Sequence, residues 1–255
     1  MQKILFAALA LSIGQTIQAQ SPATPAANGP AVLTEGKIIY ERKVNVHRRM
    51  TDESMKSMIP EFSTSKSELN FSAAESIYKN IKEEEDIRDH ADEDNNRVIM
   101  KFGGGDDQVY KNYTLEKMTE QRELGPKKYL IEDTLPRQNW KLSEETKTIK
   151  GYTCKKAMTH NREGKEVIAW YCEDIQTSTG PEGYGGLPGL ILELNSNDAE
   201  IVITVLEITT KGFDKKMVKA PTDGKKISRK EFQQMMTEQF GANPNGGPTI
   251  RIIRN

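Results

Sequence analysis

Short apolar segments that alternate with polar residues are the feature that most constrains how this chain folds. In the segment Gly36–His47, the apolar residues Ile38, Tyr40, Val44 and Val46 keep a period of two, which predicts a strand with one buried face. The same kind of segment recurs at 66–71, 76–81, 97–102, 108–113, 115–121, 127–131, 146–149, 151–160, 165–173, 190–194 and 200–208. Many short strands at close spacing predict an antiparallel meander and not alternating β and α units.

Two helices are expected beside these strands. Residues 51–59 form a short apolar-faced segment that Pro60 ends, because proline cannot continue a helix. Ser228 and Glu231 have the spacing of a capping box before an apolar face, and Gly241 ends that helix. We therefore predict a mainly β (α+β) fold: a curved antiparallel β meander, or a half-open barrel, with one short N-terminal helix and one C-terminal helix packed on it.

The N-terminus predicts export. Lys3 precedes an apolar run, Ile4 to Ile13, that is too short to span a membrane, and Ala19 provides the small residue that signal peptidase requires. An N-terminal anchor helix is the alternative. No later run approaches about 18 apolar residues, so we expect a protein that is not membrane-spanning and lies in the periplasm, at the cell surface or outside the cell.

The expected domain organisation follows from composition. Residues 1–19 are a signal peptide, and residues 20–35, rich in Pro, Ala and Ser, are a disordered leader. Residues 36–241 form a single β-rich domain, and residues 242–255 are a flexible tail. The formal net charge of −1 for 255 residues gives no basic excess to attract nucleic acid.

The two cysteines of the chain, Cys154 and Cys172, are predicted to face each other in a hairpin. If the turn is centred on Glu163, residues whose numbers sum to the same value are paired, so that Met158 lies opposite Ile168 and the cysteines lie opposite each other. An exported pair at this separation predicts a disulfide. A redox-active pair is the alternative.

The sequence contains no recognisable catalytic or metal-binding constellation. Asp92, Asp94 and Asn96 alternate as in some calcium loops, but the glycine and distal glutamate of such loops are missing, so a solvated acidic loop is the better interpretation. The histidines lie on separate predicted elements: His47, His90 and His160. We therefore expect no enzyme activity, no metal and no cofactor, with a cation site at the acidic loop as the alternative.

A longer pattern suggests a family. The segment 180–194 contains the string GLPGLI at 186–191, and it follows Trp140 to Ala157 and Ala169 to Tyr171 in the order typical of exported GLPGLI proteins of Bacteroidetes. The chain resembles that family from about Lys37 to Ile208, and the resemblance implies no catalytic residues. The strand order is also similar to LolA-like carriers, which wrap a curved sheet around a hydrophobic cavity.

The string has a structural interpretation of its own: a Gly-Pro loop that seats a buried strand. The alternative is a rim loop that contacts a ligand or partner. The residues concerned are Gly180, Pro181, Gly185, Gly186, Leu187, Pro188, Gly189, Leu190 and Ile191.

These observations lead to one main hypothesis and two alternatives. The main hypothesis is an exported, non-enzymatic binding or carrier module of the cell envelope, whose ligand is hydrophobic or peptide-like. The first alternative is an interaction subunit that accompanies an envelope protein such as an outer-membrane receptor or transporter. The second is a hydrolase with an unrecognised site.

Overall fold

The computed structural model describes residues 32–50, 52–82, 88–91, 97–101, 105–211, 213–240 and 249–253. The strands in these ranges are β1 (Gly36–Asn45), β2 (Phe62–Phe71), β3 (Glu75–Asn80), β4 (Arg88–Ala91), β5 (Arg97–Lys101), β6 (Gln108–Asn112), β7 (Lys117–Leu124), β8 (Lys127–Thr134), β9 (Lys141–Ile149), β10 (Tyr152–His160), β11 (Glu166–Cys172), β12 (Leu190–Ser196), β13 (Ile201–Thr209), β14 (Lys225–Ile227) and β15 (Thr249–Ile253). The helices are α1 (Glu53–Met58), α2 (Arg229–Phe240) and the 3-10 turns η1 (His47–Arg49) and η2 (Lys215–Met217).

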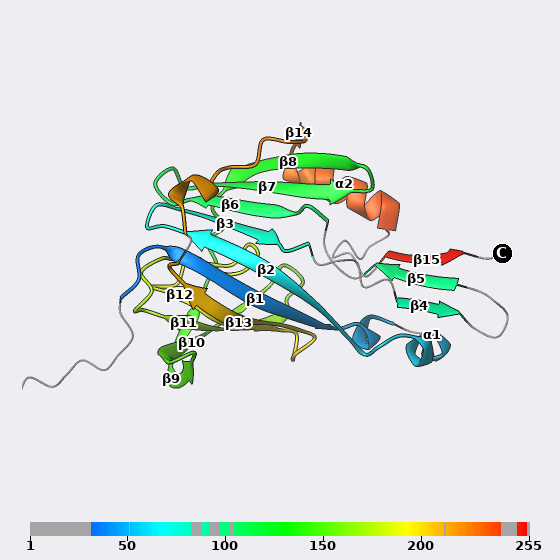
Figure 1. Ribbon diagram of the computed structural model, residues 1–255, viewed down its shortest axis with the longest axis horizontal. Coiled ribbons are helices and arrows are strands. Elements are labelled where there is room, and N and C mark those ends of the chain that lie inside the picture. The colour runs from blue at the N-terminus through cyan, green and yellow to red at the C-terminus, as the bar shows by residue number, and fades with distance from the viewer. Residues whose placement is uncertain are drawn as a thin grey trace, which may run out of the picture.

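The main structure is one 12-stranded sheet in the order β14-β8-β7-β6-β3-β2-β1-β13-β12-β11-β10-β9. It consists of two antiparallel meanders joined where β1 pairs with β13, while the short β14 pairs parallel with β8. Figure 1 shows the sheet curling from β8 at the top to β9 at the bottom. Because β14 and β9 stand at opposite ends of the order, the sheet is not closed as a barrel. The predicted mainly β fold is confirmed.

The concave side of the sheet is filled by the protein's own side chains. One core cluster contains side chains from both meanders. Its fully buried members include Tyr40, Leu69, Phe71 and Leu190. Their alternation along the strands is the period of two seen in the sequence. A filled interior leaves no space for a carried hydrophobic ligand, so the expected likeness to LolA-type carriers is wrong.

Helix α2 packs on β8 at the end of the sheet, as predicted. The rings of Tyr129 and Phe232 meet edge to face at 6.0 Å. The capping box is present: the Glu231 carboxylate accepts from the Ser228 backbone at 2.9 Å, and the Glu231 backbone donates to the Ser228 hydroxyl at 3.2 Å. The predicted N-terminal helix is α1, where the Asp52 side chain accepts the Ser54 N–H at 2.9 Å.

The predicted hairpin has the predicted register, with Met158 opposite Ile168 and Gly164 at a φ of 75°. The predicted disulfide is wrong, because Cys154 and Cys172 are free, buried thiols. Directly opposed β positions hold Cβ atoms about 4.5–5.5 Å apart, whereas a disulfide brings them to about 3.8 Å. The Cys154 thiol donates to the Tyr152 carbonyl at 3.7 Å, and the neighbouring Cys172 thiol together with burial raises the pKa of Cys154.

Several sequence expectations fall outside the described residues. These are the signal peptide, the leader up to residue 31, the acidic positions 92–96, the predicted helix end at Gly241, and positions 242–248 and 254–255 of the predicted tail. Strands β4, β5 and β15 form a separate three-stranded sheet. In the described ranges, no helix has the length and apolarity needed to cross a membrane.

Candidate functional site

The connection between β11 and β12, residues 173–189, lies against the open end of the curved sheet and is called here the 173–189 loop. It forms a small hairpin of its own, because the Gly186 N–H donates to the Ser178 carbonyl at 2.8 Å and residues 179 and 185 form a bridge. The Ile191 N–H donates to the Thr179 carbonyl at 3.1 Å and ties the loop to β12. The loop therefore has a defined shape.

Two glycines explain much of the GLPGLI string. Gly186 has a φ of 81°, which residues with a side chain rarely adopt. A Cβ at Gly189 would lie 2.1 Å from the carbonyl oxygen of Cys172. The string thus marks a tight junction between a loop and a buried strand.

The structure places the other residues of the predicted signature around this junction. Gly180, Pro181, Gly185, Leu187, Leu190 and Ile191 are buried, whereas Gly186 and Pro188 are exposed. The loop is thus a buried support with an exposed rim.

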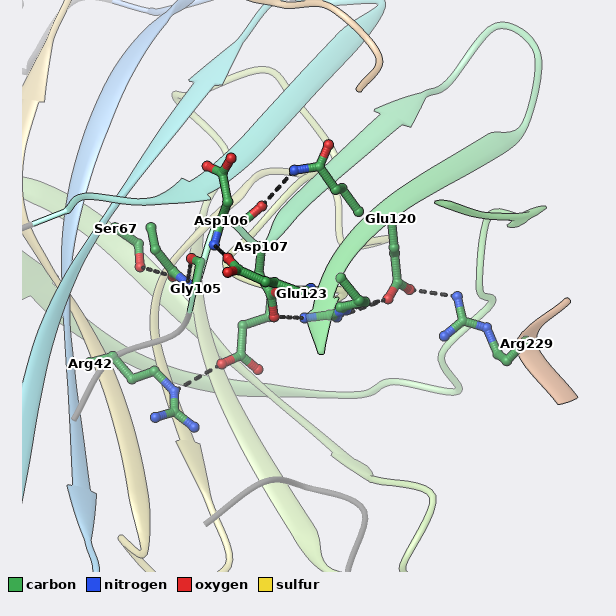
Figure 2. A network of polar contacts seen from close by, with 12 residues as sticks. Arg42, Ser67, Gly105, Asp106, Asp107, Glu120, Glu123 and Arg229 are labelled. Carbon is green, nitrogen blue, oxygen red and sulfur yellow. Dashed lines mark hydrogen bonds and ion pairs between the residues drawn. The ribbon is translucent and has the colours of Figure 1, made fainter. Parts of the chain in front are cut away.

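Two charged side chains of the upper meander hold the loop from the concave side. Arg42 on β1 pairs with Glu182 of the loop, with 3.0 Å between Nε and Oε1. Lys111 on β6 donates from Nζ to the backbone carbonyl of Tyr184. Figure 2 shows Arg42 reaching across from its strand to this ion pair.

The segment before β9 holds the loop from the other side. Trp140 donates from its indole nitrogen to the Gly185 carbonyl at 2.8 Å, and Gln138 donates to the Gly183 carbonyl at 3.3 Å. The rings of Trp140 and Tyr184 lie 6.4 Å apart. The loop is thus fixed by residues that lie far apart in the sequence.

Lys111 is the most unusual charged group of this cluster. Its side chain faces the interior, the residue is 3% exposed, and no carboxylate of the described residues lies within 4.0 Å. Burial lowers the pKa of Lys111 to about 7, although the charges of Glu120 and Glu182 act in the opposite direction. Because a lysine with this pKa is partly uncharged at neutral pH, it can be buried with a single carbonyl as its hydrogen-bond partner.

A second polar network joins α2 to the sheet beside this cluster. Glu120 on β7 forms ion pairs with Arg229 of α2 at 2.6 Å and with Arg122 at 2.8 Å. Figure 2 shows Glu120 facing Arg229. Arg122 continues the chain to Asp107 at 3.1 Å. Burial alone would raise the pKa of Glu120, but the two arginines lower it, so Glu120 is a structural carboxylate with its charge fully paired.

A surface pocket of about 450 Å³ opens beside the 173–189 loop. Its walls come from the β2–β3 turn, the residue that follows β6 and both ends of the loop. The lining residues are Ala73, Tyr113, Glu173, Gln176, Thr177, Ser178, Pro188 and Gly189. Tyr113 is fixed at this wall by a 2.7 Å hydrogen bond between its hydroxyl and that of Ser76.

The charged groups around the loop are engaged within the protein. Lys111 and Glu120 are buried, and the carboxylate of Glu182 is engaged by Arg42. Among the described residues, no group of three histidine, cysteine, aspartate or glutamate side chains is placed to hold a metal ion. The pocket beside the loop is open to a molecule in solution.

These features define a class: an open, mostly antiparallel β domain whose concave side is filled by its own side chains and fixed loop. Residues 110–233 match the family model described as the N-terminal domain of an N-glycanase peptide. That range contains Lys111 and the whole 173–189 loop. The GLPGLI assignment is therefore wrong, and its short string reflects the backbone geometry at Gly186 and Gly189.

Solved structures agree with this match. Two structures of PNGF-II, in space groups C2 and P21, superpose with TM-scores of 0.54 and 0.52 at 14% and 15% identity. Each covers 79% of this chain, but the chain spans only 32% and 33% of theirs, about a third of the length. At this identity the likeness shows the fold alone. No curated protein matches the sequence.

The comparison also corrects the main functional hypothesis. A carrier of hydrophobic or peptide ligands is wrong, because the matched family is that of an N-glycanase domain and the concave side of the sheet is filled. Sequence reasoning did not select Arg42, Lys111, Tyr113 or Gln176. Lys111 could have been found, since it falls in phase with the apolar Val109 and Tyr113 on the buried face.

The close approach at Gly189 predicts a large effect of one methyl group. Gly189→Ala forces the chain away from the Cys172 carbonyl and should destabilise the protein by about 3 kcal/mol. Gly183→Ala is the matched control, because a Cβ there meets nothing within 4 Å, and its effect should stay within about 0.5 kcal/mol. Urea unfolding measures both. Equal stability of the two variants would contradict the tight junction.

Lys111 predicts a pH dependence of stability. Its pKa is about 7 in the folded protein and 10.5 in the unfolded chain, so between these values the unfolded state binds more protons. The free energy of unfolding should therefore rise with pH across this window, with a slope of up to about 1.4 kcal/mol per pH unit. Below pH 7 both states are protonated and this slope disappears.

The slope is measured by urea unfolding at intervals from pH 7 to 9.5. Lys111→Met should flatten it, because the methionine has no proton to lose. Lys226→Met, at an exposed lysine, is the control and should keep it. A wild-type slope that persists in Lys111→Met would assign the pH dependence to another group.

Proposed function

We propose that this domain serves the removal of N-glycans from glycoproteins, as the part that engages the substrate beside a catalytic unit. The observation that carries the proposal is the match of residues 110–233 to an N-glycanase N-terminal domain, because this range holds the fixed loop and most of the pocket wall. The fold likeness to PNGF-II over 79% of the chain supports it.

The sequence raised two alternatives, an interaction subunit and a hydrolase with an unrecognised site. The match to an N-glycanase domain favours the second. We assign the domain a recognition role because the described carboxylates at the site are committed to ion pairs. Glu120 is held by two arginines and Glu182 by one. A general acid or base needs a free carboxyl group within reach of the substrate.

The expected export agrees with this role. A signal peptide at residues 1–19 would deliver the domain outside the cytoplasm, where secreted glycoproteins are encountered. An interaction with an envelope protein remains compatible with it, but the proposal does not require such a partner.

The test compares one glycoprotein with and without its glycan. The full chain is immobilised, and binding of a glycoprotein with a single N-glycan is measured against its enzymatically deglycosylated form. We expect preferential binding of the glycosylated form, because the two ligands share one polypeptide. We also expect no glycan release when the chain is incubated alone with the glycoprotein.

Two results would overturn the proposal. Equal binding of both forms would remove the role in glycan-dependent recognition. Glycan release is measured by gel mobility and mass spectrometry. Release by the chain alone would make the chain itself the hydrolase.

A further inference from the structure

The pocket beside the 173–189 loop is built from parts that the fold holds still. The backbone N–H of Tyr113 donates to Ala74 at 2.9 Å, and that of Gln176 donates to Leu33 at 2.7 Å. The Leu190 N–H donates to the Ile175 carbonyl at 3.2 Å and closes the base of the loop. A pocket that exists before binding loses little conformational entropy when a ligand enters.

The lining offers free hydrogen-bonding groups. Gln176 and Ser178 are exposed, and their side chains make no hydrogen bond with any described residue. Thr177 between them is 6% exposed, and its hydroxyl lies near that of Tyr113 without a hydrogen-bond partner among the described residues. Buried polar groups are rarely left unpaired, so the wall is suited to a ligand that both donates and accepts.

The charge of the lining selects a neutral ligand. Glu173 is the ionisable carboxylate of the wall, and Lys155 pairs with it at 2.8 Å. The lining contains no lysine or arginine, so nothing there compensates the charge of a phosphate or sulfate group. An anionic ligand would lie beside the Glu173 carboxylate, whose charge Lys155 offsets, and would find no second cation in the lining.

The remaining surface is apolar and small. Ala73, Pro188 and the ring of Tyr113 lie among the polar groups. A volume of about 450 Å³ falls in the range of small-molecule sites, roughly 300–1,000 Å³. A sugar ring combines hydroxyls at its edge with an apolar face of C–H groups, and its size is compatible with this space.

From these observations we infer that the pocket formed by Tyr113, Gln176, Ser178 and Pro188 is a binding subsite for a neutral sugar residue. The inference rests on the proposed function, in which the sugar belongs to the N-glycan of the substrate. Gln176 and Ser178 bind the sugar hydroxyl or acetamido groups, and Tyr113 and Pro188 contact its apolar face. This subsite recognises and does not cleave.

The experiment uses the full chain and three disaccharide probes. Binding of N,N′-diacetylchitobiose, of a mannobiose and of a sulfated disaccharide is followed by saturation-transfer NMR and by titration. We expect binding of at least one of the two neutral probes and none of the sulfated probe. The neutral probe that binds identifies which part of the glycan the pocket takes. Absence of binding of both neutral sugars would overturn the inference, as would equal binding of the sulfated probe.

Variants place the binding in this pocket. The double variant Gln176→Ala/Ser178→Ala removes two exposed polar side chains and should weaken binding about tenfold or more, with an unfolding midpoint close to that of the wild type. Gln233→Ala is the matched control, since Gln233 is an exposed residue of α2 outside the pocket lining. Undiminished binding by the double variant would overturn the assignment.

The two proposals can fail separately. Disaccharide binding that the double variant loses, together with equal binding of glycosylated and deglycosylated glycoprotein, supports the sugar pocket and overturns the role in glycan-dependent recognition. Preferential binding of the glycoprotein that persists in the double variant supports that role and overturns the pocket.

Discussion

The burial of the 173–189 loop against the open end of the curved sheet is the interaction on which the site depends. A sheet whose ends do not meet leaves its concave side open to water, and this chain covers it with its own side chains and this loop. The loop carries backbone polar groups into that place, where each needs a partner. Lys111, Trp140 and Gln138 supply partners to successive loop carbonyls. The same contacts fix the wall of the pocket.

The use of a lysine for one of these contacts has a cost. A buried ammonium group without a nearby carboxylate is unfavourable, and the pKa of about 7 shows how far burial offsets the distant charges of Glu120 and Glu182. The neighbouring network is different, because Glu120 is paired with Arg122 and Arg229, and Arg122 is also paired with Asp107. The loop is therefore held by a buried lysine that has no carboxylate of the described residues within 4.0 Å, beside a network whose charges are paired.

The fold could be predicted from sequence because one period of alternation determines it. Met158 and Ile168 pair as the turn at Gly164 required, and the register is set by local chemistry. The prediction failed where tertiary contacts decide. The pairing of β1 with β13 joins residues 157 to 172 positions apart, from Val44 with Ile201 to Lys37 with Thr209, and the three-residue β14 has no pattern of its own. The disulfide failed because opposed positions do not by themselves bring sulfurs into bonding distance.

The pocket could not be predicted from the sequence for the same reason, because tertiary contacts form it. The GLPGLI string, the most visible motif, marks the junction that supports the pocket wall. Gly186 and Gly189 are conspicuous in the sequence because backbone geometry demands glycine. Gln176 and Ser178, the exposed polar groups of the pocket, occupy positions where nearly any residue would fold. A motif that folding requires is thus informative about the shape of the backbone. The neighbouring residues that folding does not constrain are the ones that can determine what the pocket binds. In this domain the rigid GLPGLI junction holds the pocket wall in place, and the unconstrained side chains beside it set its chemistry.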